Sequence, residues 1–153
     1  VLKMKIRIDP DRIFKLFARV DEDPSIKEKA QITEQLLKVQ NSPAFKLGMF
    51  KKLIFNHLAF GDQLIRLVKL ADEHFDVDDV KNASEYIIYV KAWEYIADFD
   101  LKNTDSFEIL KKYSTQELLT AFKLSIHFFQ EIEEYEKCSH LHKIEKVIEF
   151  FLT

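Results

Sequence analysis

Glycine is scarce in this sequence, and its scarcity limits what the chain can fold into more than any other feature. Gly48 and Gly61 are the only glycines among 153 residues. Phosphate-binding loops, dinucleotide-binding fingerprints and the sharp turn that presents a hydrolase's serine all need glycines at several close positions. With only three prolines in addition, the chain has too few turn residues for a sandwich or barrel of many short strands. The sequence therefore predicts a helical protein.

Apolar residues recur every three or four positions over most of the chain, which is the spacing of an amphipathic helix. This pattern predicts an all-α fold, a compact multi-helix bundle of about seven helices in hairpin succession. Three helix starts are marked by a capping side chain followed by proline, at Asp9-Pro10, Asp23-Pro24 and Ser42-Pro43. The expected helices span about 10–20, 24–40, 43–75, 80–98, 105–113, 115–132 and 134–153.

The helix predicted over residues 43–75 leaves two alternatives. The apolar stripe of residues 43–75 passes Gly61 without losing phase, so Gly61 is either a close-packing point in one helix or the end of the first of two. Because uncapped helices much longer than about 25 residues are uncommon, we expect a break at Gly61-Asp62.

Residues 114–117 fit a capping box, in which Ser114 accepts from the amide of Glu117 and the Glu117 carboxylate reaches back.

The first residues of the chain follow a different pattern. Leu2, Met4, Ile6 and Ile8 alternate with Lys3, Lys5 and Arg7. A period of two predicts an extended, half-buried strand, so we divide the chain into an arm over 1–8 and one helical domain over 9–153. No later segment offers an equally clear partner strand. Because an unpaired strand edge can pair with another chain, the arm is a candidate for self-association as a homodimer. The alternatives are that it crosses a neighbouring molecule or lies on the helices of its own chain.

Charge is unevenly distributed along the chain. Residues 1–70 carry a net charge of +6 and residues 71–108 a net charge of −8, within a total of −3. We expect these blocks to face each other or water within one fold. The alternative is that the basic half contacts nucleic acid, although no zinc-finger or RNA-recognition signature accompanies it.

Residues that could carry chemistry do not form a recognisable set. A helix would place Cys138 and His142 on one face and His140 elsewhere, so a tetrahedral metal would need ligands from distant segments. No histidine follows a glutamate by three residues, as di-iron bundles require. The acidic run at 72–79 lacks the glycine and final glutamate of a calcium loop. We therefore predict no catalytic residue, no metal and no cofactor.

The single cysteine, Cys138, cannot form an intrachain disulfide, which favours a reducing compartment and predicts a cytoplasmic protein. No stretch has the length and apolar character of a membrane-spanning helix, and the first residues lack the apolar core of a signal peptide. We expect no membrane partner.

An abundant apolar core without a catalytic set leads to one functional hypothesis. We expect a non-enzymatic helical module that binds another protein or a second copy of itself and serves an interaction or regulatory role. The alternative is a nucleic-acid-associated regulator that uses the basic first half. Tyrosine and tryptophan tolerate a wet edge and dominate binding hot spots. The candidate partner-binding residues are Lys3, Lys5, Arg7, Tyr86, Tyr89, Trp93 and Tyr95.

Overall fold

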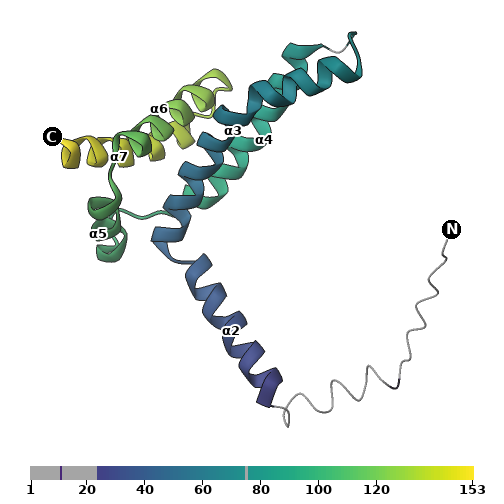
Figure 1. Cartoon of the computed structure of the whole chain (residues 1–153). Helices are drawn as coiled ribbons and strands as arrows, with labels where there is room; N and C mark the ends of the chain where they lie inside the picture. The colour runs from purple at the N-terminus through teal and green to yellow at the C-terminus, as the bar shows by residue number, and fades with distance from the viewer. Residues whose placement is uncertain (1–10, 12–23, 75) are drawn as a thin grey trace. The chain divides into compact units, whose positions relative to one another are not determined.

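The structure is a computed structural model that describes residue 11, residues 24–74 and residues 76–153 (Figure 1). Its chain divides into two compact units, Val1–Gln40 and Asn41–Thr153, which are treated separately below. The predicted arm over 1–8 and nearly all of the predicted first helix over 10–20 lie outside the described residues. The prediction of a single domain over 9–153 therefore stays a prediction.

The elements of the described chain are all α-helices, which confirms the predicted fold class. Their bounds are α2 Pro24–Gln40, α3 Pro43–Ala71, α4 Val77–Ile96, α5 Thr104–Tyr113, α6 Gln116–Glu131 and α7 Tyr135–Leu152. Within the second unit α3 packs along α4 and α6 packs along α7, so the expected hairpins are present (Figure 1). Among residues 24–74 and 76–153, no helix is both long enough and apolar enough to cross a lipid bilayer.

The first unit contributes one described helix, α2. It begins at Pro24, as the Asp23-Pro24 signal predicts. Its apolar side chains Ile32, Leu36 and Val39 are each more than half exposed.

The predicted break at Gly61-Asp62 is wrong, because α3 continues through both residues to Ala71. The start is as expected: Ser42 accepts a hydrogen bond from the amide of Phe45, and Pro43 occupies the first turn. Gly61 does not have the positive φ of a helix-ending glycine. A Cβ atom at Gly61 would meet only the His57 ring, at 3.9 Å, so close packing does not require glycine either. The unbroken apolar stripe pairs with α4, and this pairing supports the long helix.

Asparagine and aspartate side chains start the next two helices. Asp76 accepts from the amides of Asp78 and Asp79, so α4 begins at Val77, three residues earlier than predicted. Asn103 caps α5 by accepting from the Asp105 amide. The carboxylates of Asp76, Asp78, Asp79 and Asp105 lie where the positive end of the helix dipole favours negative charge.

The predicted capping box is displaced by one residue. The hydroxyl of Thr115, not that of Ser114, accepts from a backbone amide of α6, which belongs to Leu118. The Ser114 hydroxyl instead donates to the Leu110 carbonyl at the end of α5. The Glu117 carboxylate pairs with Lys51 of α3 at 3.1 Å rather than reaching back. Thr115 caps α6 because the Ser114 hydroxyl is already hydrogen-bonded to the last turn of α5.

The core of the second unit lies where residues 47–54 of α3 and residues 89–96 of α4 meet α5, α6 and α7. In α3 the buried residues are Leu47, Phe50 and Ile54, and in α4 they are Tyr89, Ala92 and Ile96. Phe50 packs on Phe122 of α6 with ring centroids 4.6 Å apart. No residue of α3 after Ile54 and none of α4 before Tyr89 is buried, within the part of the hairpin that the structure describes.

The turn between α6 and α7 is closed by Glu133, which has a φ of 62°. Its amide donates to the Gln130 carbonyl at 3.0 Å, and the amide of Glu134 donates to the Phe129 carbonyl at 2.9 Å. These two bonds form a Schellman motif, in which glycine is the usual residue at the left-handed position. The turn confirms that α6 and α7 form a hairpin, but at a conformational cost because Glu133 has a Cβ atom.

Replacing Glu133 with glycine should therefore stabilise the protein. We expect Glu133→Gly to raise the free energy of unfolding by about 1 kcal/mol, because glycine adopts the left-handed conformation without a steric penalty. Urea unfolding followed by circular dichroism measures this change. Lys143→Gly is the control: Lys143 is exposed in the middle of α7, so glycine there should lower stability by about 1 kcal/mol. A loss of stability in Glu133→Gly would contradict the assignment of strain to this turn.

Candidate functional site

The most unusual surface of the second unit is the half of the α3–α4 hairpin that lies away from the core. We call residues 55–71 of α3 together with residues 77–88 of α4 the distal hairpin. In Figure 1 it extends beyond the ends of α6 and α7. Its exposed large apolar side chains are Leu58, Phe60, Leu64, Leu67, Leu70, Tyr86 and Ile87. Leu70 is 85% exposed and Leu67 is 64% exposed.

One hollow lies on the distal hairpin between α3 and α4. It has a volume of about 430 Å³ and an almost wholly apolar lining. Its lining residues are Leu53, Asn56, His57, Phe60, Gly61, Leu64, Ser84, Ile87 and Ile88. Such a hollow offers little to orient a polar substrate, but it can accept an apolar side chain.

A larger groove lies at the base of the distal hairpin, where the hairpin meets α6. We call it the aromatic groove, and its volume is about 690 Å³. Its lining residues are Leu58 of α3, Asn82, Glu85, Tyr86 and Tyr89 of α4, Leu124, His127, Phe128 and Glu131 of α6, and Ile132. Apolar and aromatic side chains thus share this groove with two carboxylates.

Three aromatic rings, one stacked pair and one tilted neighbour, lie together in the aromatic groove. Tyr89 stacks on Phe128 with centroids 4.6 Å apart and planes 13° apart, and Tyr86 contacts Phe128 at 6.4 Å. Burial, and to a smaller extent the negative charge of Glu85, raises the pKa of Tyr89. Its phenol therefore stays neutral at physiological pH. Tyr86 is 54% exposed and presents its ring to solvent.

The structure brings together two of the four predicted aromatic residues. Tyr86 and Tyr89 both line the aromatic groove, and their role in binding stays a prediction. Trp93 lies further along α4, with its ring edge-on to Phe129 and to His140. Tyr95 contacts Phe45 edge-on at 6.3 Å and lies outside the groove. The predicted basic residues Lys3, Lys5 and Arg7 lie outside the described residues.

Sequence reasoning missed the contribution of α6 to this surface. Phe128 and Glu131 join Tyr86 and Tyr89 only because α6 crosses the hairpin at this point. One signal was present: α6 carries apolar residues on two adjoining faces, more than contact with α7 alone requires.

The cluster of possible metal ligands on α7 separates in the structure. The thiol of Cys138 contacts the Ile126 carbonyl at 3.6 Å, and burial raises its pKa. His140 contacts the Ile96 carbonyl at 2.8 Å through Nε2, and His142 contacts Glu145 at 3.0 Å through Nδ1. Across residues 24–74 and 76–153, no three histidine, cysteine or acidic side chains are placed to hold a metal ion. Cys138, His140 and His142 therefore each contact a different partner.

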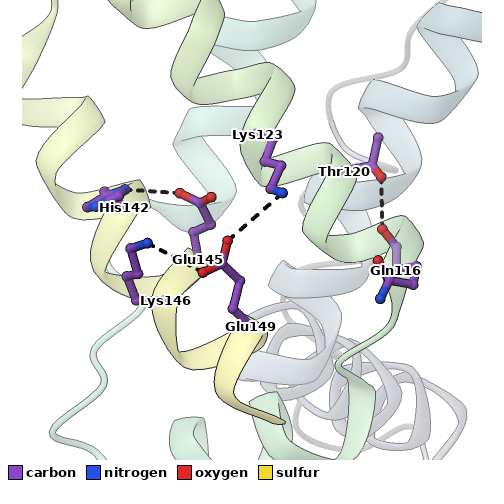
Figure 2. Close-up of polar contacts among 7 residues, drawn as sticks. All are labelled: Gln116, Thr120, Lys123, His142, Glu145, Lys146 and Glu149. Carbon is purple, nitrogen blue, oxygen red and sulfur yellow. Dashed lines mark hydrogen bonds and ion pairs between the residues drawn. The ribbon is translucent and has the colours of Figure 1, made fainter. Parts of the chain in front are cut away.

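A second polar cluster joins α6 to α7 (Figure 2). Lys123 of α6 and Lys146 of α7 both approach the Glu149 carboxylate, at 3.9 Å and 3.4 Å. The two lysines are more than half exposed. Exposed pairs of this kind contribute about 0.2–1 kcal/mol, and neither hollow described above includes these residues. The cluster is a surface ion-pair network between two helices.

Comparison of the chain with protein-family models, with curated proteins and with solved structures found no match.

Proposed function

We propose that the protein is a non-catalytic, helical protein–protein interaction module whose contact surface is the distal hairpin together with the aromatic groove at its base. One observation carries this proposal: seven large apolar side chains of the distal hairpin are exposed on a helix pair whose core-facing half is well packed. Three of them, Phe60, Leu64 and Ile87, line one apolar hollow, and apolar surface gathered in this way is typical of an interaction site.

The arrangement of the hairpin also supports this function. The part of α3 that precedes the distal hairpin is packed in the core through Phe50 and Ile54, both 0% exposed. The distal hairpin therefore extends from a well-packed base. The apolar hollow can accept an anchoring side chain, and aromatic residues beside it are typical of binding hot spots.

Crosslinking from within the surface tests this function. A photoreactive amino acid at Leu67 of the full chain should form crosslinks, in the cells that make the protein, to one defined protein identified by mass spectrometry. The same amino acid at Lys111, exposed on α5, is the matched control and should not form that product. Light scattering of the purified chain shows whether the crosslinked protein is a second copy. Equal crosslinking from both positions, or none from Leu67, would overturn the proposal.

A further inference from the structure

We propose that the aromatic groove binds a basic amphipathic helix of a partner protein, with apolar side chains of that helix on the groove's aromatic floor and its lysines or arginines against the groove's carboxylates. This inference deepens the proposed function and rests on it.

The form of the groove matches a helical ligand. Its walls are two helices, α4 and α6, and Leu58 of α3 also lines it. The floor is apolar, with Tyr86, Leu124 and Ile132 available to side chains spaced along one face of a ligand helix. A groove between helices is a common receptor for such a face, which docks through residues at positions i, i+3, i+4 and i+7.

The negative charge of the groove favours a positively charged ligand. Glu85 and Glu131 line the groove, and no lysine or arginine lines it. In the described part of the chain neither carboxylate forms an ion pair or hydrogen bond. Both are therefore available to a cationic side chain from another molecule. Complementary charge of this kind favours a basic partner and repels an acidic one, including the phosphates of nucleic acid.

The exposed tyrosine adds a second preference for cations. The Tyr86 ring is 54% exposed beside Glu85 on the same helix. A lysine or arginine that reaches Glu85 can also lie over a tyrosine face and gain a cation–π interaction. An aromatic floor beside carboxylates thus suits a helix that carries large apolar residues along one face and basic residues beside that face.

The test uses two fluorescein-labelled peptides, each about 18 residues long or roughly five helical turns. The first peptide contains leucine at helical spacing and lysine at all the remaining positions. The second peptide has glutamate in place of each lysine. Fluorescence anisotropy measures their binding to the full chain. We expect the lysine peptide to bind, with an affinity that falls as salt is added, and the glutamate peptide not to bind.

Variants locate the binding site. The double variant Glu85→Gln and Glu131→Gln should weaken binding of the lysine peptide about tenfold, and so should Tyr86→Ala. The double variant Glu108→Gln and Glu136→Gln is the matched control, since it removes two exposed carboxylates from α5 and α7. It should change the affinity less than about twofold. Circular dichroism confirms that each variant is folded.

Several outcomes would overturn the inference. These are equal binding of both peptides, equal weakening by the two double variants, or a dimer whose dissociation by Tyr86→Ala shows that a second copy occupies the groove. Binding of a nucleic acid that competes with the lysine peptide would do the same. If Leu67 still forms its specific crosslink when the lysine peptide fails to bind, the proposed function stands and only the assignment of the groove is lost.

Discussion

Replacing Phe122 with alanine is expected to lower the free energy of unfolding by about 3–5 kcal/mol. Phe122 of α6 is 0% exposed, and its ring packs on Phe50 of α3 with centroids 4.6 Å apart. This contact joins the α3–α4 hairpin to the α6–α7 hairpin. Alanine would leave a cavity that the surrounding helices fill only in part, so the loss exceeds the transfer free energy of the ring. Urea unfolding followed by circular dichroism measures it.

The control for this prediction is Phe60→Ala on the distal hairpin. Phe60 is 59% exposed, so the same chemical change should alter stability by less than about 0.5 kcal/mol. A similar loss from both variants would mean that the distal hairpin belongs to the folding core, and would remove the basis for treating it as a contact surface.

Replacing Ile144 with aspartate should cost more than about 4 kcal/mol at neutral pH. Ile144 of α7 is 1% exposed within the core cluster. Burial disfavours a charged carboxylate and would raise the pKa of the new aspartate above its unfolded value of about 3.9. The destabilisation should therefore shrink as the pH falls toward 4 and grow as the pH rises through the raised pKa, where the buried group must ionise or the protein unfold.

The matched control places the same carboxylate one residue away. Lys143 is exposed on α7, so Lys143→Asp should change stability by less than about 0.5 kcal/mol at every pH tested. Thermal unfolding of both variants between pH 4 and pH 8 distinguishes them. An Ile144→Asp protein as stable as Lys143→Asp would contradict the placement of Ile144 in the core.

Much of the helical fold could be predicted because its signals are local. Ser42 marks the start of α3 and Asp76 marks the start of α4, because each side chain accepts from backbone amides within three residues. Gly61 misled the prediction for a different reason. A glycine ends a helix only when its backbone adopts a positive φ, and at Gly61 the packing of α3 along α4 maintains the helical backbone instead.

The candidate site was less predictable than the helices. Tyr86 and Tyr89 could be selected because their residue types favour binding surfaces. Their neighbours Phe128 and Glu131 come from α6, some forty residues later in the chain. The docking of one hairpin on another determines which helices cross and where they cross. No local sequence pattern predicts that docking. For the same reason the hydrophobic stripe of α3 could not reveal that its second half stays exposed.

The unbroken course of α3 has a consequence for how the molecule opens. One end of this helix is anchored by Phe50 and Ile54, while the other end has only α4 beside it among the described residues. Amide protons should therefore exchange with solvent progressively faster from Ile54 toward Ala71, since local opening follows the density of buried contacts. A protein bound at the far end would suppress this fraying and could be detected by slower exchange there, even when nothing changes in the core.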